Sequence, residues 1–430
     1  MPDGLISDTI FALSSGAPPA AIAVIRISGP KAGAAQIVLA GRNLPPRRAV
    51  SVTLRDETGA KLDQVLALWL PGPQTATGED TLELHCHGGR AVVAVIEAAL
   101  AQIQGLRSAT PGEFTRRAFA NGKIDLAEAE GLADLLSAET ELQRQSAIAM
   151  AGGEFSALVA KWREDLLNLS AAVEAVLDFS DDEDVSALPP NFWLGLEALG
   201  AAISAWLIRP RAESLREGFR VVLAGPPNVG KSTLFNALVE TEAAITAPIA
   251  GTTRDVLTHP VALAGVPFRF VDTAGLREAA GDSIEAIGVE RAKAALTQAD
   301  LVLWLGGQGE GSSGAWEIEP QADRHATATK LKPRHRISAV TGQGMDALRA
   351  DLIATARSAL PRPGEAALNA RQHRLLAESS EALISAANLS DPLLVAESLR
   401  LARLGFDGLL GRTTTEDMLD ALFARFCIGK

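Results

Sequence analysis

One motif constrains this chain more than any other feature of its sequence. Residues 225–232 read GPPNVGKS and match the pattern G-x-x-x-x-G-K-[ST] in full. The mostly apolar residues 220–224 before the motif predict a strand, and residues 233–239 after it predict a helix. A glycine-rich loop between a strand and a helix is typical of a phosphate-binding loop, in which backbone amides surround the phosphate groups. The sequence therefore predicts a nucleotide-binding α/β domain.

The residues of this motif have different expected roles. Lys231 reaches the β- and γ-phosphates, and the Ser232 hydroxyl binds Mg²⁺. Asn228 places a side-chain oxygen near the phosphates, where it either holds a monovalent cation or only caps the turn. The residues expected to bind the nucleotide here are Asn228, Val229, Gly230, Lys231, Ser232 and Thr233.

Three further segments follow in an order that favours a GTPase over a generic ATPase. Residues 268–271 predict a strand that ends in Asp272, the first residue of the sequence DTAG, and this carboxylate lies near Mg²⁺ in such proteins. Between the two motifs, residues 251–255 read GTTRD and offer a threonine to Mg²⁺. A late strand at 336–337 is followed by a pair placed to contact the base. These segments add Thr252, Thr253, Asp272, Thr273, Ala274, Gly275, Ser338 and Ala339 to the expected site.

The residue after the DTAG sequence bears on the chemistry of hydrolysis. It is Leu276, where Ras-like enzymes have a glutamine that orients the attacking water. The chain must therefore position water by another group or hydrolyse GTP slowly. Glu285 is a candidate general base that acts through a bridging water, although a solvated helix residue is an equal alternative. A monovalent cation held by Asn228 would supply the positive charge of an arginine finger.

The rest of the 430-residue chain divides into α/β and helical parts, as expected of roughly three domains. Residues 21–27 and 81–87 predict strands of a small α/β unit. From Leu126 the apolar residues recur with helical spacing, and this pattern returns after the PRPG sequence at 361–364. The expected fold is α/β plus all-α, with a nucleotide-binding domain inserted into a helical one. The expected boundaries are 1–123 for the N-terminal α/β domain, 124–217 for the first helical part, 218–355 for the inserted domain and 356–430 for the second helical part.

Composition limits the classes of protein to which this chain can belong. The net charge of −12 argues against a protein that coats nucleic acid non-specifically. Two cysteines, Cys86 and Cys427, are too few for a disulfide framework or a four-thiolate zinc site. Neither a signal pattern nor an unbroken apolar run of about 18 residues is evident, so we expect a cytoplasmic protein without a membrane span. Scattered arginines are candidates for an RNA-binding surface, with plain surface charge as the favoured interpretation; they are Arg42, Arg47, Arg48, Arg116 and Arg117.

Segments outside the nucleotide motifs form a specific combination. They read DTI at 8–10, IRISG at 25–29, ELHCHGG at 83–89, PGEFTRRAF at 111–119, NGKIDL at 121–126 and FCIGK at 426–430. Together with the GTPase motifs, these segments resemble the tRNA-modification GTPase MnmE family, also called TrmE, over nearly the whole chain.

This resemblance implies an architecture and an activity. Proteins like this have an N-terminal folate-binding α/β domain that forms homodimers, a discontinuous helical domain, and an inserted P-loop (Ras-like) G domain. The implied activity is a K⁺-stimulated GTPase that works with the flavin-dependent partner MnmG (GidA). Together they install a 5-aminomethyl or 5-carboxymethylaminomethyl group on the wobble uridine of tRNA. The implied cofactors are GTP, Mg²⁺, K⁺ and 5-formyl- or methylene-tetrahydrofolate, which supplies the one-carbon unit.

The resemblance also assigns roles to residues. Those that match the folate contacts are Arg26, Glu83, Lys123 and Lys430, and Cys427 matches a C-terminal cysteine near that site. Thr253 joins Ser232 as an Mg²⁺ ligand, and Glu285 matches the catalytic glutamate. The implied K⁺ ligands are Asn228, Ala247, Ile249 and Thr252, within a K⁺-binding loop formed by Ala247, Pro248, Ile249, Ala250, Gly251, Thr252 and Thr253. Ala247 stands where the family has threonine, and a backbone carbonyl would serve there.

One element of the family pattern is missing. The guanine-reading sequence N-K-x-D is absent, although its aspartate would accept two hydrogen bonds that adenine cannot donate. One candidate for its position is residues 329–332, with Lys332 in place of the aspartate, and the other is residues 320–323, which keep Asp323 but lack the asparagine and lysine. The spacing to Ser338 favours the first. Loss of a buried hydrogen-bonding carboxylate forfeits discrimination of about 10⁴-fold, so this departure puts guanine selectivity in doubt.

Three functions from different classes remain. The leading one is the K⁺-stimulated GTPase of tRNA modification. A folate- and partner-binding scaffold with a weakened G domain is favoured by the absent N-K-x-D sequence, but the intact Lys231, Ser232 and Asp272 argue against it. A ribosome-assembly GTPase of the Era or Der type shares the Asn228 loop, yet it leaves the N-terminal motifs and the FCIGK end unexplained and ranks last.

Overall fold

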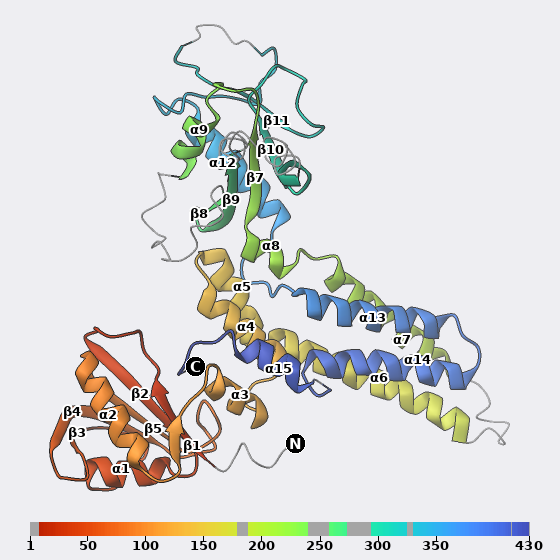
Figure 1. Ribbon diagram of the computed structural model, residues 1–430. Helices are drawn as coiled ribbons and strands as arrows, with labels where there is room; N and C mark the ends of the chain where they lie inside the picture. The colour runs from red at the N-terminus through yellow and green to blue at the C-terminus, as the bar shows by residue number, and fades with distance from the viewer. Residues whose placement is uncertain are drawn as a thin grey trace, which may run out of the picture. The chain divides into compact units, whose positions relative to one another are not determined.

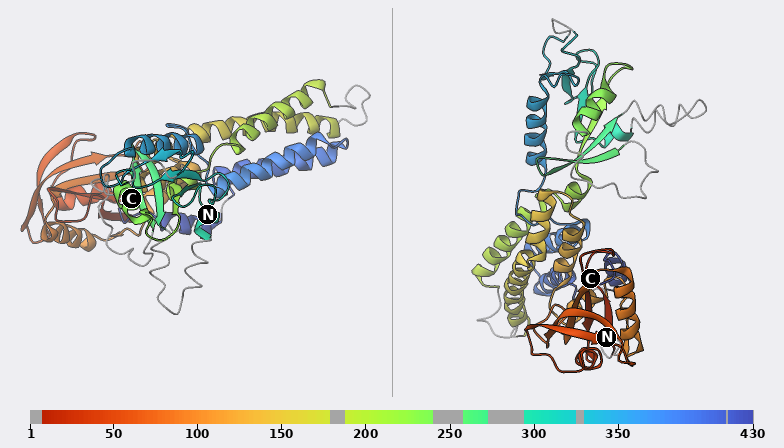
Figure 2. Two further views of the ribbon diagram at one scale, coloured as in Figure 1. Left: turned by 90° about the horizontal axis from the view of Figure 1, so that it is seen from above. Right: turned by 90° about the vertical axis from the view of Figure 1, so that its left-hand side faces the viewer.

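The structure, a computed structural model, describes residues 8–178, 188–239, 258–272, 294–324, 330–413 and 415–429 (Figure 1). The chain forms two compact units (Figures 1 and 2). One unit combines the chain up to Ala133 with the residues from Asp407 onward, and the other runs from Asp134 to Phe406. The first unit therefore contains segments from both ends of the chain.

The first unit is built on a six-stranded sheet in the order β3-β4-β5-β2-β1-β6. Neighbouring strands are antiparallel except β1 and β6, which are parallel. The strands expected at 21–27 and 81–87 are confirmed as β2 and β5. The strand bounds are β1 (Thr9–Leu13), β2 (Ile22–Ser28), β3 (Ala49–Arg55), β4 (Lys61–Leu70), β5 (Thr81–His87) and β6 (Leu106–Ser108).

One face of this sheet carries the apolar core. Ile25 of β2 and Leu84 of β5 are buried there. Two helices, α1 (Ala32–Ala40) and α2 (Arg90–Gln102), pack on this face. Because successive side chains of a strand point to opposite faces, Arg26 projects from the other face of the sheet. The sequence alternation thus separates a buried face from a face available for binding.

The end of the chain packs into the first unit. α15 (Glu416–Phe423) contacts α3 (Glu113–Ala120) and shares an apolar cluster with the first turns of α4 (Leu126–Ser137). Gly429 lies against the end of β1, where an added Cβ would come within 2.0 Å of the Leu13 carbonyl oxygen at a φ of +93°. A side chain does not fit in this conformation, so glycine at position 429 lets the chain pass close to the end of β1.

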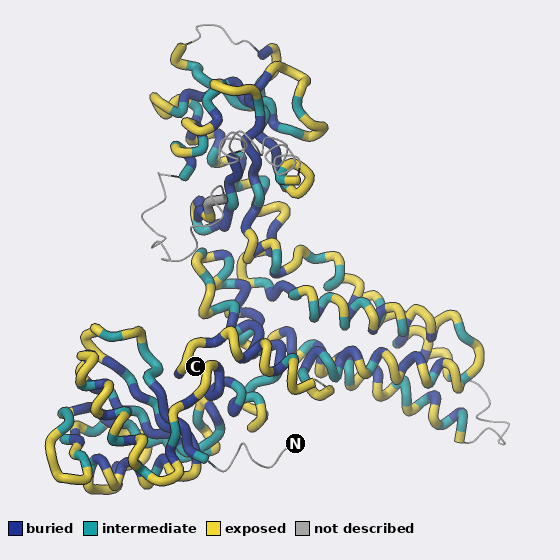
Figure 3. The backbone as a smooth tube through the Cα atoms, in the orientation of Figure 1, coloured by how far each residue is buried: buried dark blue, intermediate teal, exposed yellow. Residues whose placement is uncertain are grey.

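The helical part of the second unit is a bundle held by apolar and aromatic contacts. α7 (Pro190–Leu207) packs against α6 (Glu154–Asp178) and α13 (Ala370–Ala387). Trp162 of α6 contacts both Trp206 of α7 and Phe406 of α14. Buried and exposed residues alternate along these helices in Figure 3, as expected of amphipathic helices around a shared core. α14 spans Pro392–Leu409, and α5, which precedes α6, spans Glu141–Ala151.

One stretch of this bundle bears on the expected lack of a membrane span. Among the residues that the structure describes, Pro190–Glu217 is long and apolar enough to cross a membrane by length and composition, a test that buried core helices also pass. The expectation that no such stretch exists is therefore corrected. Phe192, Leu196 and Ile203 of its first helix are buried in the bundle, although only 22% of the apolar window is buried.

The second unit also contains a six-stranded sheet in the order β12-β11-β10-β7-β9-β8. Its neighbouring strands are parallel except β8 and β9, which form an antiparallel hairpin. The strands predicted at 220–224 and 268–271, each before a nucleotide motif, are confirmed as β7 and β9. The element bounds are β7 (Phe219–Ala224), α9 (Lys231–Val239), β8 (Thr258–Leu263), β9 (Val266–Asp272), β10 (Leu301–Trp304), β11 (Trp316–Glu319), β12 (His335–Arg336) and α12 (Met345–Ala359).

Apolar packing and hydrogen bonds connect this sheet to the helical part of the same unit. Leu142, in the first turn of α5, is buried in the apolar core of the sheet. Its backbone amide donates a hydrogen bond of 3.1 Å to the carbonyl of Gly265, in the turn between β8 and β9. Gln143 donates from Nε2 to the carbonyl of Leu215 in α8 (Ala212–Glu217) at 2.8 Å. The β8–β9 hairpin and the start of α5 are thereby held together.

Candidate functional site

The GPPNVGKS motif forms the loop between β7 and α9. Gly225, Asn228 and Gly230 have φ values of +148°, +61° and +102°, which curl the backbone around one centre. Asparagine is one of the few other residues that adopt a positive φ readily. Lys231 is buried, and its Nζ donates to the carbonyls of Gly225 (3.0 Å) and Pro226 (2.7 Å). The loop therefore holds an ammonium group at its centre, as the sequence predicts.

A serine and an aspartate from separate motifs meet beside this loop. The Ser232 hydroxyl donates a hydrogen bond of 2.7 Å to Oδ2 of Asp272, at the end of β9. Asp272 is buried, and β9 lies next to β7 in the sheet. The structure thus brings together two oxygen donors of the kind that Mg²⁺ prefers; the sequence predicts Ser232 as a ligand of that ion and Asp272 near it.

A cavity of about 820 Å³ opens at the phosphate-binding loop. Its wall includes Asn228, Gly230, Lys231, Ser232, Thr233, Trp304, Gln321, Asp323 and Ala339. Gln321 approaches the loop closely, since an added Cβ on Gly230 would lie 3.7 Å from its Nε2. Ser338 is fully buried behind Ala339, and its backbone amide donates to the carbonyl of Gln343 at 2.9 Å. The late segment expected to contact the base therefore reaches the same cavity as the phosphate-binding loop.

The structure places the two candidate guanine-reading segments differently. β11 ends at Glu319, so residues 320–323 follow a strand of the sheet directly, and Asp323 lines the cavity. Lys332 is exposed and is not among the described residues that line the cavity. Lys330 is buried away from the loop, with its Nζ 2.5 Å from Oε2 of Glu317. Residues 320–323 thus follow a strand at the same edge of the sheet as the phosphate-binding loop, which is where ligands bind in such folds.

Part of the expected site lies outside the described residues. These positions are Ala247, Pro248, Ile249, Ala250, Gly251, Thr252, Thr253, Thr273, Ala274, Gly275, Glu285 and Lys430. Their roles stay predictions.

The first unit carries the residues that match folate contacts. Arg26 of β2 and Glu83 of β5 are cross-strand neighbours, and Nε of Arg26 lies 2.9 Å from Oε1 of Glu83. The Arg26 guanidinium also lies over the ring of Phe114, 5.9 Å from its centroid. His85, next along this face of β5, has its Nε2 3.5 Å from the second carboxylate oxygen of Glu83. The Arg26–Glu83 pair is partly buried, and the side chains of Phe114 and His85 lie beside it.

Two other expected residues lie at the borders of this region. Lys123 is exposed, and its side chain lies near Gly78, where an added Cβ would come within 3.0 Å of its Cε. Cys427 is exposed, and its carbonyl accepts a hydrogen bond of 3.4 Å from the amide of Gly112, just before α3. Because Phe114 lies in the first turn of α3, the C-terminal segment and the Arg26 pair approach the same helix. Among the contacts of the described residues, none joins Lys123 directly to Arg26 or Glu83.

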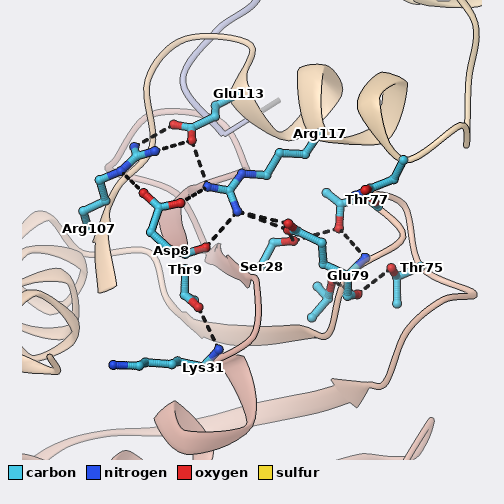
Figure 4. Close-up of polar contacts among 12 residues, drawn as sticks. Asp8, Thr9, Ser28, Lys31, Thr75, Thr77, Glu79, Arg107, Glu113 and Arg117 are labelled. Carbon is cyan, nitrogen blue, oxygen red and sulfur yellow. Dashed lines mark hydrogen bonds and ion pairs between the residues drawn. The ribbon is translucent and has the colours of Figure 1, made fainter. Parts of the chain in front are cut away.

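A buried network of charges was missed by the sequence analysis. Arg107 donates to both oxygens of Glu113, at 2.8 and 2.5 Å, and Arg117 also donates to Glu113, at 3.0 Å (Figure 4). Arg117 is buried, so its interpretation as a plain surface charge is wrong. Glu113 belongs to the same PGEFTRRAF motif as Arg117, but the other two acidic partners of Arg117, Asp8 and Glu79, are far from it in the sequence. Its neighbour Arg116 forms exposed pairs with Glu416 and Asp420.

The network controls the ionisation of Glu113. Burial by itself raises the pKa of this carboxyl group. Hydrogen bonds from Arg107, from the Thr110 amide and from Arg117 outweigh burial and bring the pKa down to about 2. The carboxylate is therefore ionised at neutral pH although it is buried.

Replacing Glu113 by glutamine is expected to remove a pH-dependent part of the stability. Because the pKa is lowered on folding from an ordinary value of about 4.3, the ionised group stabilises the fold above that pH, and this contribution is lost as the pH falls toward 2. The shift corresponds to about 3 kcal/mol at pH 7 and to about half of that at pH 3. Calorimetric unfolding of the wild type and of Glu113→Gln at both pH values measures the difference. A difference that does not shrink at pH 3 would contradict this role.

The second unit has the architecture of a known class. A phosphate-binding loop between a parallel strand and a helix, with an adjoining serine–aspartate pair, defines a P-loop nucleotide-binding protein, and the mixed sheet is consistent with a G domain. Comparison with known proteins identifies the family. Residues 9–123 match the GTP-binding protein TrmE N-terminus, and residues 126–427 match the MnmE helical domain. The chain belongs to the tRNA modification GTPase MnmE family.

Relatives match the chain over its full length. The tRNA modification GTPase MnmE of Novosphingobium aromaticivorans is 63% identical over 437 residues, which cover 99% of this chain and 100% of the relative. The protein of the same name from Erythrobacter litoralis is 62% identical and covers 98% of this chain and 100% of its own. The protein of the same name from Rhizorhabdus wittichii is 56% identical, and the match covers 100% of this chain and 98% of the relative. The family resemblance drawn from the sequence motifs is thus confirmed.

Proposed function

We propose that this chain hydrolyses GTP to GDP and phosphate and that this activity serves the modification of the wobble uridine of tRNA. One observation carries the proposal. Lys231, Asp323 and Ser232, whose hydroxyl is bonded to Asp272, line one cavity, so residues suited to hold a triphosphate and to recognise a guanine share one site. Family membership supplies the biological setting.

The chain's own residues bind and orient the nucleotide. Lys231 and the amides of its loop neutralise the β- and γ-phosphates and align the γ-phosphate for attack. Ser232 and Asp272, with Thr253, are the proposed holders of Mg²⁺, which neutralises charge on the phosphate oxygens when it is bound. Asp323 accepts hydrogen bonds from N1 and the exocyclic amine of guanine. Its place in the cavity favours the GTPase over the scaffold with a weakened G domain.

The groups that promote hydrolysis are proposed from the family resemblance. Asn228, which lines the cavity, is a proposed K⁺ ligand. The other proposed ligands are Ala247, Ile249 and Thr252. Oxygen donors of amide and carbonyl type suit such a cation. Glu285 is the proposed general base, because Leu276 has no group that can orient water.

The first unit is proposed to bind the one-carbon donor. Arg26, Glu83, Lys123 and Lys430 are the proposed contacts to 5-formyl- or methylene-tetrahydrofolate, with Cys427 nearby. An arginine–carboxylate pair suits the hydrogen-bonding edge of a pterin, and lysines suit the glutamate carboxylates. We further propose a cytoplasmic homodimer formed through the N-terminal domain, which acts on tRNA with MnmG (GidA). The domain boundaries after residues 123, 217 and 355 and the inserted Ras-like G domain belong to the same proposal.

Nucleotide hydrolysis by the purified chain tests the proposed activity. Phosphate release from GTP and from ATP is measured in buffers that contain either K⁺ or Na⁺ as the only monovalent cation. We expect turnover that is selective for GTP and faster in K⁺, because the cation replaces an arginine finger. Turnover that is absent, or indifferent to the base and the cation, would contradict the GTPase and support the folate- and partner-binding scaffold.

A further inference from the structure

The buried charge network contains a pair whose purpose is not explained by stability. Arg117 of α3 donates from Nη1 to Oε1 of Glu79 at 3.1 Å and from Nη2 to Oδ1 of Asp8 at 2.6 Å (Figure 4). The side chains of Arg117 and Glu79 are only 7% and 9% exposed. Both ions lose their hydration when buried, and the attraction between them often does no more than offset that cost. A role in placing other residues is therefore a better reason for the pair.

Glu79 is bonded to the strand that carries Arg26. Its Oε2 accepts a hydrogen bond of 2.6 Å from the hydroxyl of Ser28, the last residue of β2. Ser28 and Arg26 are two residues apart in one strand and therefore project from the same face of the sheet. The Ser28 hydroxyl also contacts that of Thr77, at 2.7 Å. The loop formed by residues 75–79 is thus anchored to β2.

The opposite side of the same loop is bonded to the segment that carries Lys123. Arg117 reaches Glu79 from within α3, and Asn121, just after α3, donates from Nδ2 to the carbonyl of Thr77 at 2.7 Å. Lys123 follows two residues later, and its side chain lies against Gly78. The loop 75–79 therefore lies between β2 and the end of α3, with hydrogen bonds to both.

We propose that the Glu79–Arg117 pair is a positioning device that fixes the spacing between Arg26 and Lys123. The inference rests on the folate binding proposed above. A tetrahydrofolate has a pterin at one end and a glutamate at the other, so it is bound well only when the groups for both ends are held at a matching distance before it arrives. Glu79 and Arg117 act through the loop 75–79 and are positioning residues.

The test measures binding of 5-formyltetrahydrofolate to the full-length protein by titration calorimetry. Glu79→Gln keeps the size of the side chain and an acceptor for Ser28 but removes the charge that holds Arg117. We expect affinity to fall by about 10- to 100-fold, the usual loss at metal sites when residues that orient the binding groups are removed. Asn121→Ala, which removes a partly buried contact to the same loop, is also expected to lower affinity and serves if Glu79→Gln fails to fold.

A ligand with only one of the two ends separates positioning from general damage. 5-Formyltetrahydropteroate lacks the glutamate, so the spacing between the two sets of contacts no longer matters. The wild type and Glu79→Gln are therefore expected to bind this ligand with equal affinity. Equal losses for both ligands would overturn the positioning role, and so would undiminished binding of 5-formyltetrahydrofolate by both variants.

Glu416→Gln is the matched control. It removes one of the two acidic partners of Arg116, which precedes Arg117 in α3, without touching the loop 75–79, and folate affinity is expected to stay unchanged. The GTP turnover of each variant reports whether the protein is intact. Failure of the wild type to bind 5-formyltetrahydrofolate would overturn the folate assignment itself, and this inference with it, whereas binding by the wild type with no effect of Glu79→Gln would overturn this inference alone.

Discussion

Lys231→Ala is expected to lower the rate of GTP hydrolysis by about 10²- to 10³-fold, the usual loss when one preorganised contact to developing charge is removed. The Lys231 ammonium group is buried at the centre of the phosphate-binding loop, and the carbonyls of Gly225 and Pro226 hold it there. Phosphoryl transfer depends mainly on positioning and on neutralising charge, so no other side chain of the loop replaces it. Single-turnover phosphate release at saturating GTP measures the rate.

The control for this variant is Lys332→Ala. Lys332 carries the same charge in the same unit but is exposed and does not belong to the described lining of the cavity. Turnover is expected to be unchanged in Lys332→Ala. An unchanged rate in Lys231→Ala as well would contradict the phosphate-binding role of the loop.

Asp323→Asn is expected to abolish the preference for GTP over ATP and to create a preference for XTP. The carboxylate accepts hydrogen bonds from two donors of guanine, and a site built for such donors discriminates by about 10⁴-fold. Asparagine offers an acceptor and a donor, which match the N1–H and the C2 carbonyl of xanthine. Competition of GTP, ATP and XTP for hydrolysis by the wild type and the variant measures the change.

This second prediction also decides between the two candidate positions for base recognition. Glu310, another acidic residue of the cavity wall, supplies the control, and Glu310→Gln is expected to keep the preference for GTP. If Asp323→Asn also keeps it, the assignment of residues 320–323 to the base is wrong. A changed preference in Lys332→Ala would support residues 329–332 in their place.

The phosphate-binding site was predictable because its residues are close together in the sequence. A glycine-rich loop, the strand before it and the helix after it form one continuous segment, and their geometry follows from local backbone preferences. Asp272 belongs to a distant segment, but it ends a strand with an obvious apolar pattern. Its meeting with Ser232 therefore followed from the motif order alone.

The base-reading segment and the charge network were harder to predict for a different reason. Asp323 reaches the cavity because β11 pairs with β10, and such pairing between separate strands is not encoded in the spacing of a few residues. Arg117 looks like any surface arginine until Asp8 and Glu79, which are far from it along the chain, are placed around it. Burial of a charge depends on these long-range partners.

The β8–β9 hairpin gives the nucleotide site a mechanical connection to the bundle. β9 is a single seven-residue strand, about 20 Å long, with Asp272 at one end and the Gly265 turn, bonded to α5, at the other. The Asp272 end of β9 and the turn bonded to Leu142 in the first turn of α5 are therefore opposite ends of one strand. β9 therefore connects Asp272, which is proposed to lie at the metal and its phosphates, to the first turn of α5, where the helical part begins.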